Sequence, residues 1–259
     1  MHSTTTANSA AGSTSQRPPS MRVEIWADII CPWCGLGEHR FEVALRQFVH
    51  RDDVSVVHRS FQLDPTLPVG VTVPVTEHLA RKFGGGDAGR ARIAASQQQI
   101  EAMARDEGLQ PYHVAENVTG STALAHELLA YGTDRGRQAE AWKAVSRAYF
   151  GEQQSIFDTD ALVDLAGKMG LDPVEVRTVL ETRQYRGEVE QDGLEARQLG
   201  ATGVPFFVID RRYGVMGAQP ADVLLDALQQ AWHESHPTPQ RFIGADGEAM
   251  CGPETCSPA

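Results

Sequence analysis

The sequence predicts an α/β fold in which a large all-helical block interrupts a small sheet. Three observations lead to this expectation. An apolar run over residues 21–26 leads into a Cys-Pro-Trp-Cys motif at the start of a helix-like stretch. Residues 75–169 show helical periodicity and no convincing strand. A second apolar run follows Pro205 directly, as in a buried strand that begins after a proline.

Length, composition and charge limit the classes of protein to which this chain can belong. The chain has 259 residues, of which 41% are hydrophobic, so one large domain or two small ones can bury an ordinary core. A formal net charge of -11 argues against nucleic acid as a partner, because phosphate binding requires a basic surface. No apolar stretch approaches the length of a membrane span, so we expect no membrane association. Residues 1–20 are rich in Ser and Thr and lack the apolar core of a secretory signal, which predicts a disordered lead-in.

The four cysteines form two close pairs, Cys31 with Cys34 and Cys251 with Cys256. This number is too small for a disulfide scaffold. It fits a protein that uses thiols as reagents in a reducing compartment, so we expect a cytoplasmic location. Free N–H groups and the helix dipole at a helix start favour a thiolate over a thiol. Pro32 suits the first helical turn, where its missing N–H costs nothing.

These features predict a dithiol–disulfide exchange site in which Cys31 attacks and Cys34 resolves. A lone CxxC motif is also compatible with half of a zinc site, or with two buried cysteines that have no chemical role. The strand before the motif and the helix after it favour the redox interpretation.

The remaining elements follow from periodicity and turn residues. We expect strands at residues 21–28, 54–59, 206–209 and 213–216, and helices at residues 34–50, 76–83, 88–107, 122–132, 138–150, 160–169, 173–181, 183–199 and 220–232. The first strand–helix–strand unit implies a parallel pair, and the turn at Arg211-Arg212 implies an antiparallel hairpin. Asp172 and Pro173 supply an N-cap and a first-turn proline for one helix.

This order of elements is that of a thioredoxin-like fold with an insertion. We assign residues 21–64 and 184–235 to the thioredoxin-like domain and residues 65–183 to a helical insertion domain. Residues 236–259 form a C-terminal tail with the second cysteine pair. In such a fold the Cys-Pro-Trp-Cys motif and the Pro205 loop are distant in sequence and adjacent in space.

Several segments between residues 22 and 232 form a recognisable combination. They are residues 27–34 with Gly37, 61–65, 79–84, 125–128, 148–150, 170–172, 203–207 and 214–220. Together they resemble the DsbA-like thioredoxin-fold oxidoreductases, most closely the FrnE-type group. The resemblance implies a protein disulfide oxidoreductase whose partners are client proteins or small thiols.

The resemblance also implies roles for individual residues. Cys31 would be the nucleophile and Cys34 the resolving cysteine, with Pro205 as a cis proline that faces the disulfide. Val204 would offer backbone hydrogen bonds to a bound chain, and the helical insertion would roof the site. Gly35 departs from the family, which often has an aromatic residue at this position.

Other candidates line or adjoin the motif. Pro32 and Trp33 are candidate substrate-binding residues, and we expect Trp33 to be exposed beside the sulfurs rather than packed inside. His126 is either a satisfied core or cleft histidine or part of the substrate site. Asp28 would relay protons to Cys34 or cap the helix.

The tail pair and the alternatives stay open. Four roles are open for Cys251 and Cys256. They are an exposed pair without a chemical role, a disulfide of their own, a relay of electrons to Cys31 and Cys34, or ligands of a metal shared with that pair. We expect no cofactor beyond the redox-active disulfide, with glutathione as a candidate co-substrate, and no resident metal. The alternative functions are a glutathione-dependent isomerase or transferase on the same fold, and a chaperone-like zinc-binding protein that uses all four cysteines.

Overall fold

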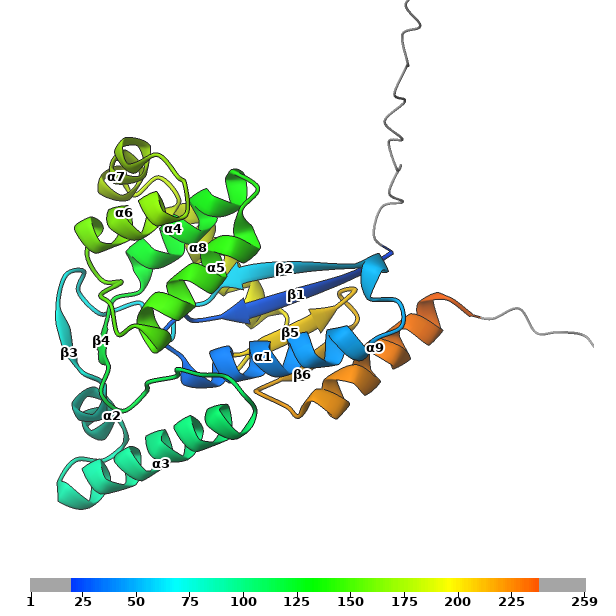
Figure 1. Cartoon of the computed structure of the whole chain (residues 1–259), viewed down its shortest axis with the longest axis horizontal. Coiled ribbons are helices and arrows are strands. Elements are labelled where there is room, and N and C mark those ends of the chain that lie inside the picture. The colour runs from blue at the N-terminus through cyan, green and yellow to red at the C-terminus, as the bar shows by residue number, and fades with distance from the viewer. Residues whose placement is uncertain (1–19, 238–259) are drawn as a thin grey trace, which may run out of the picture.

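The computed structural model describes residues 20–237, which form a four-stranded sheet with helices on both faces (Figure 1). The strands are β1 (Met21–Ala27), β2 (Val54–Ser60), β5 (Phe206–Ile209) and β6 (Tyr213–Met216). Helices α1 (Pro32–Gln47) and α9 (Ala221–Ser235) cover one face, and α8 (Arg186–Gln198) packs on the other. A short 3-10 turn, η1 (Arg51–Asp53), precedes β2.

The strand order β2-β1-β5-β6 places β5 and β6, which follow the insertion, beside β1, the first strand of the described chain. β1 and β2 are parallel, with Met21 opposite Val54, because α1 crosses over between them. β5 runs antiparallel to β1 and turns into β6 through Asp210 and Arg211, whose φ values are 50° and 56°. The parallel pair and the hairpin predicted from the sequence are both confirmed, as is the thioredoxin-like fold.

The insertion lies between β2 and α8. Its elements are β3 (Thr72–Pro74), α2 (Val75–Phe83), α3 (Asp87–Asp106), β4 (Val118–Gly120), α4 (Ala123–Asp134), α5 (Gln138–Ser146), the π-helical turn η2 (Arg147–Gly151), α6 (Thr159–Lys168) and α7 (Pro173–Thr182). β3 and β4 pair as a separate antiparallel ladder. The expectation of no strand between residues 75 and 169 is therefore wrong at β4, whose three residues are too few to show an alternating pattern.

The helix boundaries show how local sequence acts. α1 begins at Pro32, before the expected residue 34, because Cys31 already has the extended backbone of an N-cap. Asp172 caps α7 as expected, with its carboxylate accepting the Val174 N–H at 2.8 Å. No helix within residues 20–237 combines the length and apolar character needed to cross a membrane.

Three apolar clusters hold the layers together. Phe41 of α1 stacks on Phe207 of β5, with ring centroids 5.6 Å apart, inside the cluster under α1 and α9. On the opposite face, Trp26 lies against Phe206 at 5.9 Å in the cluster that includes α8. The third and largest cluster joins α3, α4 and η2 of the insertion to the start of α1, and it contains both motif cysteines. The insertion therefore packs directly over the motif.

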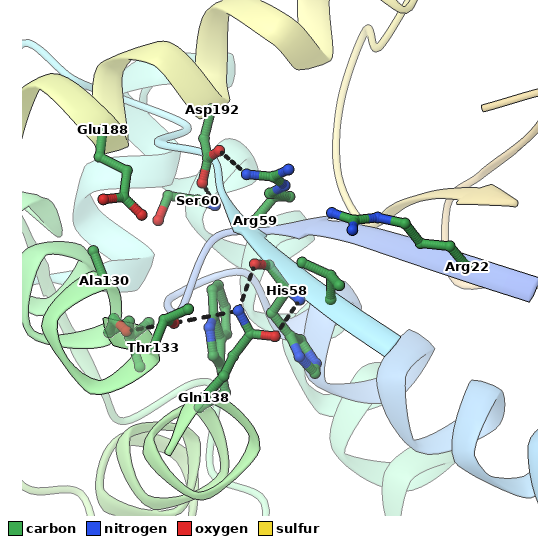
Figure 2. A pocket seen from close by; sticks show the side chains of 12 residues that line it. Arg22, His58, Arg59, Ser60, Ala130, Thr133, Gln138, Glu188 and Asp192 are labelled. Carbon is green, nitrogen blue, oxygen red and sulfur yellow. Dashed lines mark hydrogen bonds and ion pairs between the residues drawn. The ribbon is translucent and has the colours of Figure 1, made fainter. Parts of the chain in front are cut away.

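The outer edge of β2 is closed by side chains instead of another strand (Figure 2). Gln138 acts as a substitute peptide group: its Oε1 accepts the His58 N–H at 3.0 Å, and its Nε2 donates to the His58 carbonyl at 3.2 Å. From the other side of a cavity of about 100 Å³, Asp192 accepts the Ser60 N–H at 2.9 Å. Free edge groups would otherwise be a template for pairing with another chain.

Replacing Gln138 by Ala should lower the free energy of unfolding by about 1–3 kcal/mol, because the N–H and C=O of His58 lose their partners inside the fold. Urea denaturation followed by circular dichroism measures the change. Gln98→Ala, at an exposed position of α3, is the matched control and should change stability by less than about 0.5 kcal/mol. Equal effects of the two substitutions would contradict the edge-closing role.

Candidate active site

The motif sits where β1 gives way to α1. β1 ends at Ala27, and a turn closed by a 3.0 Å hydrogen bond from the Cys31 N–H to the Asp28 carbonyl redirects the chain. The Cys34 N–H then donates to the Cys31 carbonyl at 2.9 Å, which places the second cysteine one helical turn after the first. Both thiols are free in this structure. The local geometry is that of a pair able to close a small disulfide ring.

The loop before β5 lies against this helix start. The Val204–Pro205 peptide bond is cis, as the resemblance implies, and the Cys31 Sγ lies 3.7 Å from the Val204 carbonyl oxygen. A Cβ on Gly37 would come within 2.8 Å of the Pro205 ring, so only glycine permits this approach. The structure thus joins two segments that are 173 residues apart in the sequence.

The two sulfurs lie under the surface, with little of either residue in contact with solvent. Cys31 is 6% exposed and Cys34 is 4% exposed, whereas Trp33 between them is 40% exposed, as expected from the sequence. Pro32 and Val204 are half-buried at the border of the same region. Two nearly buried sulfurs therefore lie beside an exposed aromatic ring.

Cys34 is held as a thiol. Burial raises its pKa well above the ordinary value, and the neighbouring Cys31 sulfur and the Asp28 charge raise the pKa further. A thiol with a raised pKa stays protonated through neutral pH. In the reduced protein Cys34 is consequently a weak nucleophile, and it needs a proton acceptor when it reacts.

Asp28 is buried beneath the motif and does not cap α1, so that alternative is wrong. Its Oδ2 accepts the Leu63 N–H at 2.7 Å, and its Oδ1 lies 3.2 Å from Nε2 of His126. Nδ1 of His126 is buried without a partner among the described residues. A bare Nδ1 acceptor costs less than an unpaired N–H, so this network assigns the proton to Nε2, which donates to Asp28.

His126 therefore lies beneath the site, fully buried on α4 and edge-on to Trp142 at 5.8 Å. No surface of its ring is open to a substrate. Its geometry is that of a partner for the Asp28 carboxylate, which it helps to hold under the first turn of α1.

Tyr112, in the connection between α3 and β4, is a site residue that the sequence did not reveal. Its hydroxyl donates a 2.6 Å hydrogen bond to the carbonyl of Pro32, inside the motif itself. A single tyrosine in an irregular segment carries no periodic or motif signal. Only the folded arrangement places it beside the cysteines.

Two expectations concern other parts of the chain. Cys251 and Cys256 lie outside the described residues, so their proposed redox role stays a prediction. Within residues 20–237, no group of three or more His, Cys, Asp or Glu side chains is arranged to hold a metal ion.

This fold has counterparts among known proteins. Residues 22–229 match the family model of the DSBA-like thioredoxin domain, and the chain belongs to this family. The crystal structure described as the probable DsbA oxidoreductase SCO1869 from Streptomyces coelicolor is 47% identical, with a TM-score of 0.78, over 92% of this chain and 99% of that one.

Two more distant relatives set the limits of the likeness. The uncharacterized protein YwbO of Bacillus subtilis is 28% identical over 81% of this chain and 96% of its own length. The structure of a 2-hydroxychromene-2-carboxylate isomerase has a TM-score of 0.63 at 13% identity, over 82% of this chain and 98% of that one. The second likeness shows a shared fold only.

In the reduced protein, iodoacetamide at pH 7.5 should modify Cys31 faster than Cys34 by about tenfold or more, because only the thiolate reacts and burial keeps Cys34 protonated. Mass spectrometry of peptides after timed quenching measures both rates. The Cys251→Ser/Cys256→Ser variant removes competing thiols. The two motif cysteines are almost equally buried, so access alone would give similar rates, and equal rates would contradict the assignment.

Proposed function

We propose that this protein is a thiol–disulfide oxidoreductase that acts through Cys31 and Cys34 on protein or small-molecule thiols. The observation that carries the proposal is the 3.7 Å approach of the Cys31 sulfur to the Val204 carbonyl, beside the cis Pro205 and at the start of α1. Family membership and the name given to the Streptomyces structure support it.

In the reducing direction, the Cys31 thiolate attacks one sulfur of a client disulfide. A bond forms between Cys31 and that sulfur, and the other client sulfur leaves as a thiolate that takes up a proton. Cys34 then loses its proton and attacks the Cys31 sulfur. The mixed disulfide breaks, the Cys31–Cys34 disulfide forms, and the client leaves with two thiols. The reverse sequence oxidises a client dithiol.

The surroundings assign further roles within this proposal. Val204 is half-buried beside the Cys31 sulfur, and its backbone would pair with an extended client segment, as an edge strand pairs with a peptide. The exposed ring of Trp33 would pack against that segment. The buried Asp28 carboxylate, held by His126, is a candidate to accept the proton of Cys34, on whose pKa it acts.

Membership of the FrnE-type group, a cytoplasmic location and glutathione as co-substrate complete the proposal. The alternative of a glutathione-dependent isomerase or transferase shares the fold of the isomerase structure. Two sulfurs one turn apart are what exchange chemistry requires, and they favour the oxidoreductase.

Cys31→Ser should abolish insulin reduction and dithiothreitol oxidation, because among residues 20–237 the only other cysteine is the buried Cys34, whose pKa is raised. Cys34→Ser should keep the first step and accumulate mixed disulfides, which non-reducing gels and mass spectrometry detect. The Cys251→Ser/Cys256→Ser variant leaves the motif intact and is the control. A Cys31→Ser protein with undiminished exchange activity would refute the proposal.

The couple should also be less oxidising than periplasmic DsbA, whose potential is about −120 mV. Trp33, and not a cationic side chain, separates the two cysteines, so no side chain within the motif stabilises the Cys31 thiolate by charge. Equilibration with glutathione buffers, followed by alkylation, measures the potential. A value as high as that of DsbA would overturn this expectation.

A further inference from the structure

The segment between α3 and β4 runs past the start of α1 and places Tyr112 on the Cys-Pro-Trp-Cys turn (Figure 1). The phenol hydroxyl reaches the Pro32 carbonyl at 2.6 Å. It does so only because residue 35 is a glycine: a Cβ there would lie 2.4 Å from the Tyr112 hydroxyl and 3.0 Å from its ring. Gly35 and Tyr112 therefore fit each other as a pair.

The phenol ring is fixed from behind. It stacks on Phe150 of η2, with ring centroids 4.5 Å apart. The next residue, His113, donates its N–H to the Phe150 carbonyl at 2.7 Å. Glu101 of α3 accepts the N–H groups of Val114 and Ala115 at 2.7 and 2.9 Å. These bonds hold the backbone directly after Tyr112, and the stacking on Phe150 holds its ring, so the ring forms a wall beside the motif.

This wall closes one side of the dithiol. Tyr112 is itself 8% exposed and belongs to the same apolar cluster as both cysteines. Burial raises its pKa well above the ordinary tyrosine value, and the charges of the nearby cysteine sulfurs raise it further, so the hydroxyl stays a hydrogen-bond donor. The Cys31 sulfur also lies against the Val204 carbonyl, and Trp33 of the same motif is exposed.

We propose that Tyr112 determines client specificity: its ring, seated on Pro32 over Gly35, admits disulfides in small molecules or extended segments and excludes disulfides set in bulky, folded surroundings. The inference rests on the proposed oxidoreductase function. The Tyr112 hydroxyl is bonded to the backbone of the motif, so its role is to position and restrict, not to transfer electrons or protons.

Three variants test the role of the Tyr112 ring, and each changes a different part of its contact with the motif. Tyr112→Phe removes only the hydrogen bond to Pro32, and Tyr112→Ala removes the ring. Gly35→Ala leaves the ring intact but places a methyl group where the hydroxyl sits, while alanine favours the helix itself. The controls are Tyr131→Phe, which removes a hydroxyl bound to Glu175, and Gly187→Ala, which adds a Cβ with nothing within 4 Å.

The readout is the ratio of kcat/KM for reduction of insulin to kcat/KM for reduction of hydroxyethyl disulfide, with dithiothreitol as the reductant. Tyr112→Ala and Gly35→Ala should raise this ratio about tenfold, as expected when a group that restricts a site is removed. Tyr112→Phe should raise it by about 2- to 10-fold, the effect of one hydrogen bond. In a Tyr112→Ala background, Gly35→Ala should add nothing, because both act through the same ring.

An unchanged ratio in Tyr112→Phe and Gly35→Ala, both with wild-type circular dichroism and thermal unfolding, would overturn the proposal even if Tyr112→Ala fails to fold. Alkylation gives a second readout that needs no turnover. Release of the ring should speed modification of Cys31 by a bulky maleimide more than by iodoacetamide, and equal acceleration would also count against it. If the wild type lacks exchange activity, the proposed function fails, whereas the alkylation result still decides whether Tyr112 is a wall.

Discussion

The close approach of α1 to the Val204–Pro205 loop is the constraint on which the site depends. A Cβ on Gly37 would lie 2.8 Å from the Pro205 ring, so one missing side chain lets the helix start and the loop meet. This contact puts the Cys31 sulfur beside the Val204 carbonyl. The sheet enforces it, because β1 carries the motif and β5, its antiparallel neighbour, follows the loop. The chemistry of the motif is thus a product of strand pairing as much as of the four motif residues.

The insertion turns this exposed junction into a sheltered one. The largest apolar cluster of the molecule includes both motif cysteines and many side chains of the insertion. A buried carboxylate under the motif is also bonded to the insertion. Asp28 at the end of β1 is held by His126 of α4 and by the backbone of Leu63, at the start of the connection into the insertion. The same burial that shields Cys34 from solvent raises the pKa of its thiol, which keeps the thiol protonated. The contacts that bury Cys34 therefore also set the pKa of its thiol.

Elements with strong local signals could be predicted from the sequence. The apolar run before Cys31, the proline-led run after Pro205 and the cap at Asp172 gave the strands, the parallel pair, the hairpin and a helix start. β4 is too short to show periodicity. Tyr112 and the Asp28–His126 pair depend on contacts between distant segments, which no single stretch encodes. The division into domains at residues 64 and 184 stays a prediction.

The position of the insertion has a consequence for how the molecule matures. β1, α1 and β2 are contiguous and can pair as soon as they leave the ribosome, but β5 must wait until the whole insertion has been made. Until then a nascent chain carries its two thiols without the proline loop, although Tyr112, which belongs to the insertion, has already been made. The contact between the Cys31 sulfur and the Val204 carbonyl therefore forms last, and a chain stalled or truncated before β5 would carry both motif thiols without it.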